Sequence, residues 1–174
     1  NEAPIFSSTS SFSAEENQLS IGTVKATDPE GDALTFSVSG SDLSITSLGV
    51  LTFVTAPDYE TKSSYTATVS VTDGSLVDSQ IFTISVIDVD DVAPVFSSPL
   101  SFSADENQLS IGTVNASDVD SDDSSLTFSV SGSNLVISSS GVLTFETAPD
   151  YETKSSYTGT VTVSDGANST NQSI

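Results

Sequence analysis

Apolar and polar residues alternate along several short stretches of the chain, and this two-residue period is typical of half-buried β-strands. β-branched and aromatic residues prevail in the clearest stretches, which are residues 33–38, 50–53, 65–71 and 81–86. Turn-forming sequences, such as the PEGD at residues 29–32 and the Asp73-Gly74 pair, separate these stretches. No stretch has the period of an amphipathic helix. The pattern predicts an all-β fold with the strand spacing of a two-sheet antiparallel sandwich.

The alternating stretches also carry aromatic residues. Aromatic side chains on such strands usually lie in the protein interior, because their large apolar surface is removed from water there. We therefore predict that a core, rather than a platform for a ligand, contains Phe12, Phe36, Phe53, Tyr65 and Phe82.

Two near-copies of one sequence unit follow each other along the chain. Residues 2–28 match residues 92–118 at 20 of 27 positions, and residues 56–74 match residues 148–166 at 16 of 19 positions. A unit of about 90 residues is long enough for one small all-β core. The chain is therefore predicted to be a tandem repeat.

The repeat predicts two domains of about seven strands each, residues 1–91 and residues 92–174. Ile174 aligns with Phe82, so the second domain has no counterpart of residues 83–86, which form most of the last strand. We expect a shortened final strand in the second domain, and an exposed sheet edge that would be prone to pair with another chain.

Composition argues against several classes of function. The chain has 24 acidic residues against 3 basic ones, a net charge of −21, so nucleic acid and anionic lipid are poor partners. It has no Cys and no His, which removes disulfides and the usual zinc ligands. No stretch is suited to direct membrane insertion or resembles a signal peptide. We expect an extracellular, cell-surface or secreted segment whose export signals and anchors lie elsewhere.

Acidic residues gather at the joint between the two units. Asp88, Asp90 and Asp91 fall within four residues, and their carboxylates repel one another strongly unless they share a cation. Asp58 and Glu60 lie two residues apart, and an extended segment would place both carboxylates on one side. Hard oxygen donors on loops suit calcium better than zinc. The joint is therefore predicted to bind calcium.

These acidic elements resemble the motifs of the cadherin repeat family. Residues 16–17 are similar to the family's Pro-Glu-Asn element, residues 58–60 to its Asp-x-Glu element, and residues 88–94 to its Asp-x-Asn-Asp-Asn-x-Pro linker. Residues 118–120 resemble the Asp-x-Asp element of a following repeat, and Asp165 resembles its late single Asp. Five elements in the family's order make the resemblance specific. The near-identical, Arg-free units are most similar to the repetitive arrays of large bacterial surface proteins.

The resemblance implies two tandem Greek-key sandwiches of seven strands, with an immunoglobulin-like architecture and two or three calcium ions at the joint. By the resemblance, the ligands of the two ions nearer the first unit are Glu16, Asp58, Glu60, Asp88 and Asp91. Those of the third ion are Asp90, Asp118, Asp120 and Asp165. Backbone carbonyls would be the ligand atoms of Val89, Val92 and Asp123.

The resemblance also implies incomplete calcium sites near the two ends of the sequence, which neighbouring repeats of the same protein would complete. The N-terminal partial site would consist of Asn1, Asp28, Glu30 and Asp73. The C-terminal partial site would consist of Glu106, Asp150 and Glu152.

Two functions remain open at this stage. One is a structural spacer, in which calcium fixes the angle between the units and stiffens the chain. The other is a calcium-dependent binding module that engages another copy of the chain or a surface polysaccharide. The near-identity of the units favours the spacer, because a dedicated binding face would differ between the copies. Catalysis is not expected, since the chain has no His base, no Cys nucleophile and no Gly-rich phosphate loop.

A simpler interpretation is that the acidity only solvates the surface. We favour that interpretation for Glu2, Asp42, Asp78 and Asp122. It explains the joint less well, because scattered acids would not recur at five family positions.

Overall fold

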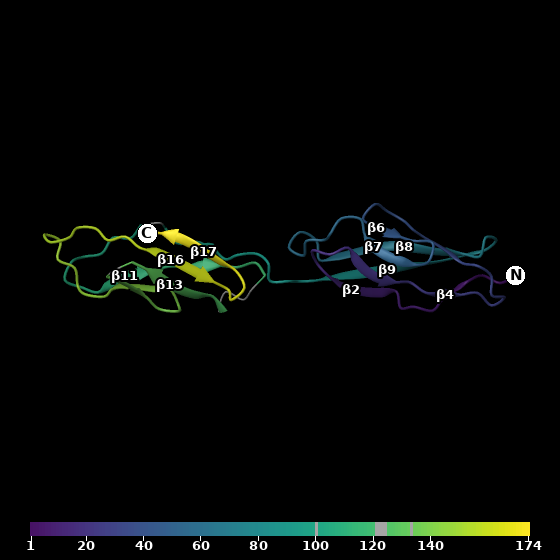
Figure 1. Ribbon diagram of the computed structural model, residues 1–174, viewed down its shortest axis with the longest axis horizontal. Helices are drawn as coiled ribbons and strands as arrows, with labels where there is room; N and C mark the ends of the chain where they lie inside the picture. Colours follow the sequence, from purple (N-terminus) through teal and green to yellow (C-terminus); the bar gives the residue numbers. More distant parts are fainter. Residues whose placement is uncertain (100, 121–124, 133) are drawn as a thin grey trace. The chain divides into compact units, whose positions relative to one another are not determined.

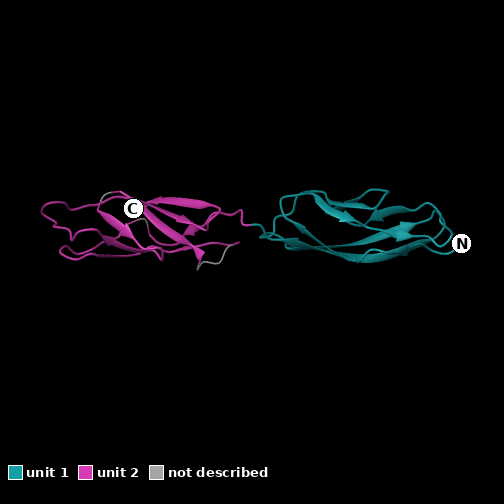
Figure 2. Cartoon of the chain, turned by 60° about the horizontal axis from the view of Figure 1, so that its bottom comes forward, with its two compact units in different colours: residues 1–89 teal, residues 90–174 magenta. Residues whose placement is uncertain are grey.

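β-strands make up the secondary structure of both halves of the chain. The computed structural model describes residues 1–99, 101–120, 125–132 and 134–174. No α-helix occurs in these ranges, and none of their elements is a helix long and apolar enough to cross a membrane. The chain divides into two compact units, unit 1 (Asn1–Val89) and unit 2 (Asp90–Ile174), which Figure 2 colours separately. The all-β prediction is confirmed.

Unit 1 contains a four-stranded sheet, a three-stranded sheet and a two-stranded ladder (Figure 1). The four-stranded sheet has the order β2 (Ser11–Glu15), β9 (Val77–Ile87), β8 (Ser64–Thr72) and β5 (Thr35–Val38). The three-stranded sheet has the order β3 (Ser20–Thr23), β7 (Val50–Phe53) and β6 (Leu43–Ile45). The ladder joins β1 (Ile5–Phe6) and β4 (Ala26–Thr27). The four stretches predicted from the alternation are thus strands β5, β7, β8 and β9.

The core of unit 1 follows from the two-residue period of its strands. In the second half of β9, Phe82, Ile84 and Val86 are buried, while the residues between them are exposed. Phe53 is also buried, and the other predicted core aromatics are partly buried against the same cluster, namely Phe12, Phe36 and Tyr65. The prediction that these aromatics form a core is confirmed.

Unit 2 repeats this arrangement with shorter strands. One sheet has the order β13 (Thr127–Ser131), β16 (Thr160–Ser164) and β17 (Ser169–Ser173). The other has the order β11 (Ser110–Thr113), β15 (Val142–Phe145) and β14 (Leu135–Ile137). The ladder joins β10 (Val95–Phe96) and β12 (Ala116–Ser117). The core cluster of unit 2 is correspondingly small, with Val114, Leu143 and Val161 at its centre.

The two units differ around their last strand. β2 runs parallel to the end of β9, from Ser11 opposite Thr83 to Glu15 opposite Ile87, and the start of β8 lies on the other side of the same residues. In unit 2 the counterpart of β2 is residues 101–105, which are not a strand, and β16 begins only at Thr160. In the described residues of unit 2, β17 ends at Ser173 and pairs with β16 from Thr160 to Ser164. The predicted shortening of the final strand is confirmed.

Candidate metal centre

The carboxylate of Glu16 joins two loop segments at one end of unit 1. Glu16 follows β2 directly, and only 3% of its surface is exposed. Its Oε2 accepts a hydrogen bond from the backbone amide of Tyr59 at 2.8 Å, and its Oε1 accepts one from the amide of Val89 at 2.8 Å. A buried carboxylate is tolerated when charged hydrogen bonds of this kind satisfy it. Glu16 therefore holds the loop around Tyr59 beside the segment that leaves β9.

Three carboxylates converge at this end of unit 1. Glu16, Glu60 and Asp88 each offer one carboxylate oxygen, and these oxygens all lie within 4.8 Å of one another. The backbone amide of Glu60 lowers the pKa of its own carboxyl group. Desolvation and the negative charges of Glu16, Asp88 and Asp58 act in the opposite direction, and the net shift of the Glu60 pKa is upward. The cluster is therefore electrostatically unfavourable without a cation.

Asp58, which the sequence predicts as a ligand, lies in the same loop as Glu60 and accepts hydrogen bonds within that loop. Its Oδ2 accepts a hydrogen bond from the hydroxyl of Thr61 at 2.8 Å, and its Oδ1 accepts one from the amide of Thr61 at 3.1 Å. These bonds with Thr61, the side-chain bond first, lower the pKa of Asp58. Among the described residues of unit 1, the carboxylates that lie within 4.8 Å of one another at this end are Glu16, Glu60 and Asp88, and the negative charge of Asp58 also acts on Glu60.

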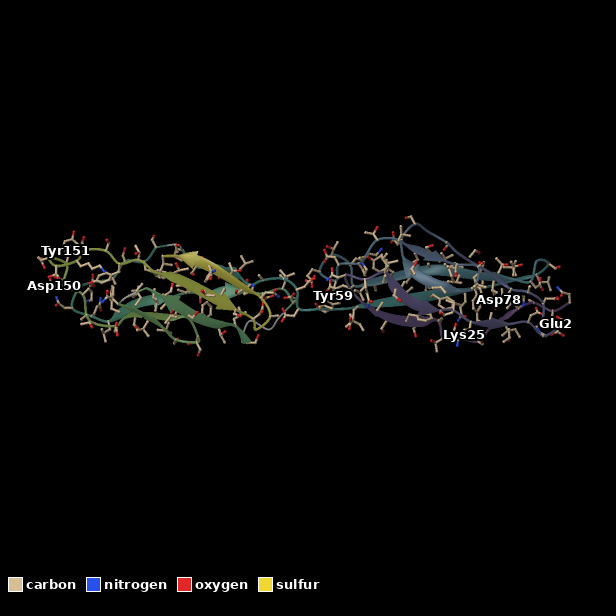
Figure 3. The ribbon with its side chains drawn as sticks, in the orientation of Figure 1. Glu2, Lys25, Tyr59, Asp78, Asp150 and Tyr151 are labelled. Carbon is tan, nitrogen blue, oxygen red and sulfur yellow. The ribbon has the colours of Figure 1, made fainter. Side chains whose placement is uncertain are left out.

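The corresponding end of unit 2 also brings three carboxylates together. Oxygens of Glu106, Asp150 and Glu152 lie within 4.8 Å of one another, and all three residues are exposed. Glu106 accepts a hydrogen bond from the amide of Tyr151 at 2.9 Å, as Glu16 does from Tyr59. Figure 3 labels Asp150 and Tyr151 in this loop. A hydrogen bond from the hydroxyl of Thr153 is the main cause that lowers the pKa of Asp150.

The opposite end of unit 2 is organised by Asp120. Its Oδ2 accepts hydrogen bonds from the amides of Asp91 at 2.8 Å and Val92 at 2.7 Å, and its own amide donates to Oδ1 of Asp118 at 3.2 Å. Burial raises the pKa of Asp120, but the hydrogen bonds with Asp118, Val92 and Asp91 outweigh it, and the pKa lies below its ordinary value. Residues 91–92 are therefore held by unit 2 itself.

Asp165 holds a turn at the same end of unit 2 as Asp120. Its Oδ1 accepts hydrogen bonds from the amides of Ala167 at 2.6 Å and Asn168 at 2.5 Å. This turn requires a left-handed residue after Asp165, and Gly166 has a φ of 115°. The side-chain amide of Asn168 lies 3.4 Å from both the carbonyl oxygen and Oδ1 of Asp90. This contact was not predicted, because Asn168 lies outside the acidic motifs that resemble the cadherin repeat family.

Unit 1 carries the same acidic arrangement at its own N-terminal end. Glu30 accepts a hydrogen bond from the amide of Glu2 at 3.1 Å, and Asp73 accepts one from the side-chain amide of Asn1 at 2.9 Å. Asp28 Oδ1 accepts bonds from the amides of Glu30 and Asp32. The amides of residues 76 and 75 lower the pKa of Asp73, in that order of effect. Figure 3 shows Glu2 and Tyr59 at opposite ends of unit 1.

Several carboxylate oxygens in these N-terminal ends are buried and accept no hydrogen bond. They are Oδ2 of Asp28 in unit 1, and Oδ1 of Asp120 and Oδ2 of Asp165 in unit 2. A buried carboxylate oxygen without a donor is costly, and a bound cation is one way to satisfy it. The donor set, which is made only of oxygens, fits a hard cation such as calcium.

The predicted ligands thus fall into four groups, each within one unit. The C-terminal groups are Glu16, Glu60 and Asp88 in unit 1, with Asp58 in the same loop as Glu60, and Glu106, Asp150 and Glu152 in unit 2. The N-terminal groups are Asn1, Asp28, Glu30 and Asp73 in unit 1, and Asp90, Asp91, Asp118, Asp120 and Asp165 in unit 2. Asp123 lies outside the described residues. The assignment of all these residues as calcium ligands stays a prediction.

Each half of the chain matches the same family model. The family is described as Bacterial Ig domain, and the matches cover residues 1–85 and residues 90–174.

Curated proteins with related sequences are large cadherins. Protocadherin Fat 4 of Mus musculus is 36% identical over 140 residues, which cover 71% of this chain and 3% of that protein. Cadherin-3 of Caenorhabditis elegans is 43% identical over 67 residues, which cover 37% of this chain and 2% of that protein. The chain therefore spans only a few per cent of the length of these relatives.

Solved structures of cadherin ectodomain repeats share the fold. Human protocadherin-24 EC1-2 aligns with a TM-score of 0.81 and 22% identity, over 100% of this chain and 94% of that one. Drosophila N-cadherin EC1-4 aligns with a TM-score of 0.77 and 22% identity, over 100% of this chain and 49% of that one. The predicted resemblance to cadherin repeats is confirmed in fold. Repeats of this type are non-enzymatic domains, in agreement with the expectation that the chain is not an enzyme.

Proposed function

Because the chain belongs to the bacterial Ig domain family and has the fold of cadherin ectodomain repeats, we propose that it is a calcium-stiffened spacer segment of an extracellular adhesion protein. In this function, calcium bound between consecutive repeats restricts their relative motion and so extends the array.

The observation that carries the proposal is the grouping of Glu16, Glu60 and Asp88. Protein oxygens bind calcium at about 2.3–2.6 Å, so two ligands of one ion lie at most about 5 Å apart. The three carboxylate oxygens lie within 4.8 Å of one another before any ion is considered. The cluster therefore suits one calcium ion with little rearrangement, and the ion would relieve the repulsion that raises the pKa of Glu60.

The second support is the covalent link between acidic groups of the two units. Val89 is hydrogen bonded to Glu16 in unit 1, and Asp91 is hydrogen bonded to Asp120 in unit 2. Consecutive Cα atoms are about 3.8 Å apart, so the Cα atoms of Val89 and Asp91 lie at most about 7 Å apart in any relative orientation of the units. We propose that Asp90, Asp91, Asp118, Asp120 and Asp165 complete the coordination that Glu16, Glu60 and Asp88 begin.

The spacer is favoured over a binding module by the near-identity of the units. The N-terminal acidic ends of both units contain equivalent hydrogen bonds. This is expected for repeats that all connect to the preceding repeat in the same way. Among the described residues, Tyr151 is the single aromatic residue with a strongly exposed side chain, so no aromatic platform for a polysaccharide is present there. Self-association with another copy is the alternative that the adhesion relatives leave open.

Thermal unfolding and small-angle scattering with calcium and with a chelator test the proposal. Calcium should raise the melting temperature and narrow the distribution of particle dimensions, with an affinity on the order of 10⁻⁴–10⁻³ M. Magnesium at the same ionic strength is the control, since its smaller ion demands a stricter geometry. If melting and scattering are the same in calcium and in chelator, the chain is not a calcium-stiffened spacer.

Asp91→Ala separates a role in the joint from a role in folding. The variant should broaden the scattering-derived dimensions in calcium while each unit keeps its own unfolding transition. Loss of both transitions would contradict a role for Asp91 in the joint.

A further inference from the structure

Strand β9 of unit 1 has a free edge along its first half. On one side β9 pairs with β8 from its first residue onward, but on the other side β2 begins to pair with it only at Thr83. The amide of Thr83 points to the β2 side, where it donates to the carbonyl of Ser10 at 2.9 Å. Amides point to the same side at every second residue of a strand, so those of Val77, Ser79 and Ile81 face the free edge.

The backbone groups of this edge are available to a further strand. No described residue of unit 1 accepts a hydrogen bond from the amides of Val77 and Ile81. The amide of Ser79 donates only to the side chain of the neighbouring Asp78, at 2.8 Å, which Figure 3 labels. The side chains of Val77 and Ile81 are 60% and 66% exposed. An exposed edge strand with aliphatic side chains is a template for pairing with another chain.

The free edge lies in a segment that differs strongly between the two units. Residues 75–82 match their counterparts in unit 2 at one position of eight, whereas the 19 residues before them match at 16 positions. The exposed Val77 and Ile81 correspond to Ser169 and Ser173 in unit 2. A dedicated binding face is expected to differ between copies of a repeat. The aliphatic edge of β9 meets that expectation and is specific to unit 1.

The sequence of the free edge is complementary to itself. It reads VDSQI, with an aliphatic residue at each end and with a carboxylate and an amide on either side of Ser79. Antiparallel pairing with a second copy about Ser79 places Val77 of each copy opposite Ile81 of the other. It also places each Asp78 opposite a Gln80. The aliphatic side chains then pack across the strands on one face, and the Gln80 amide donates to the Asp78 carboxylate on the other.

A second copy meets little electrostatic repulsion along this edge. Asp78 is the single charged residue in strands β5, β8 and β9. Charges elsewhere on the surface are screened over about 8 Å at physiological ionic strength. A half-buried charge on an edge strand often protects the edge from pairing. Here the partner's Gln80 satisfies that charge, so a second copy is accepted where a strand without a donor at that position is not.

We propose that the edge of β9 from Val77 to Ile81 is a self-association site, at which two copies of the chain pair antiparallel about Ser79. Three residues of each copy exchange hydrogen bonds with the other, about six bonds in all. The two four-stranded sheets of unit 1 thereby become one continuous sheet. The contact is small, so association is weak and depends on protein concentration.

Sedimentation of the full chain at up to about 1 mM protein tests the proposal, once with calcium and once with a chelator. A dimer whose share rises with protein concentration is expected in both solutions. The amides of Val77 and Ile81 should exchange more slowly in proportion to the dimer fraction, because both gain hydrogen bonds. A mixture of isotopically labelled and unlabelled chains should give an NOE between Val77 of one copy and Ile81 of the other.

The variant Val77→Ser with Ile81→Ser gives unit 1 the residues that unit 2 has at these positions. It should weaken association at least about tenfold, because two aliphatic side chains of each copy leave the contact. Leu48→Ser is the matched control, since Leu48 is 80% exposed, lies outside β9 and corresponds to a serine in unit 2. The control should associate as strongly as the original chain.

Several results would overturn the proposal. A chain that stays monomeric at about 1 mM does so, and so does a dimer that the double variant leaves as stable as before. An equal loss of association in Leu48→Ser would mean unspecific contact between aliphatic side chains. Protection of Val77 and Ile81 only after a different protein is added would assign the edge to that partner. These measurements do not depend on calcium, so the spacer proposal stands or falls separately.

Discussion

The carboxylate of Glu16 and the backbone amide of Val89, 73 residues apart in the chain, are joined by a hydrogen bond of 2.8 Å. Glu16 is buried, and it uses its other oxygen to bind the amide of Tyr59. The end of β2 and the segment that follows β9 are thus linked by the protein alone. A cation that binds Glu16 would add to an arrangement that the fold has already formed, which reduces the cost of ordering the site.

We expect Glu16→Ala to destabilise unit 1 even without calcium. The substitution leaves two amides without their buried acceptor, and charged hydrogen bonds of this kind contribute about 1.5–3 kcal/mol each, partly offset by relief of repulsion in the cluster. A loss of about 2–4 kcal/mol is therefore expected, measured by hydrogen exchange resolved over unit 1. Glu106→Ala is the matched control: Glu106 is exposed and binds Tyr151 at 2.9 Å, so a loss below about 1 kcal/mol is expected.

Glu60→Gln should have opposite effects on stability and on calcium affinity. The pKa of Glu60 is raised in the folded state, so its ionised form opposes folding; stability from this group is full at low pH and falls as the pH rises through the folded pKa. At pH 7 without calcium, Glu60→Gln should therefore raise the melting temperature. The same substitution removes a ligand and should weaken calcium binding in a titration. Glu146→Gln makes the same change of charge at an exposed position. It should change the melting temperature and the calcium affinity much less than Glu60→Gln does.

Asp120→Asn should make unit 2 less sensitive to acid. Hydrogen bonds with Asp118, Val92 and Asp91 hold the pKa of Asp120 below 3.8, so its contribution to stability is present above the unfolded pKa. That contribution is lost as the pH falls through the lower folded pKa. Acid titrations followed by circular dichroism should show a shallower loss of unit 2 in the variant. Asp105→Asn, at an exposed position of the same unit, should keep the acid dependence of the original chain.

Phe82→Ala should cost unit 1 much more than Ile174→Ala costs unit 2, although the two residues occupy equivalent positions. Phe82 is fully buried, with its ring centroid 5.5 Å from that of Phe6. Such substitutions cost about 3–5 kcal/mol. Ile174 is only partly buried against its core, so a loss below about 2 kcal/mol is expected in denaturant unfolding. Similar losses in both units would contradict the difference in burial between Phe82 and Ile174.

The sequence predicts the strands and the core correctly in those places where each strand has a partner strand to pair with. Residues 11–15 and residues 101–105 have nearly the same sequence, yet only the first segment is a strand. Alternation shows which residues suit a sheet, but the hydrogen bonds depend on a partner far along the chain. The sequence did predict the short β17. It did not show that the loss would extend to two other segments.

The acidic groups could be recognised from their sequence motifs. The hydrogen bonds that each acidic residue makes could not be read from those motifs. Asp58 is predicted as a ligand because it precedes Glu60 at a family position, and the motif does not show that its oxygens also accept hydrogen bonds from Thr61. A short hydroxyl side chain three residues after an Asp often makes this contact in a turn. The hydroxyl of Thr153 makes the same contact with Asp150 at 2.9 Å, so this pattern predicts the hydrogen bond in both units.

The way in which each unit holds its own entry segment has a consequence for how such chains change in evolution. Glu30 binds the amide of Glu2, and Asp120 binds the amide of Val92, so residues that precede each sandwich are secured by the sandwich that follows them. A copy gained or lost by recombination therefore carries its own connection with it. Each added copy of such a unit would keep this connection without any new contact having to arise.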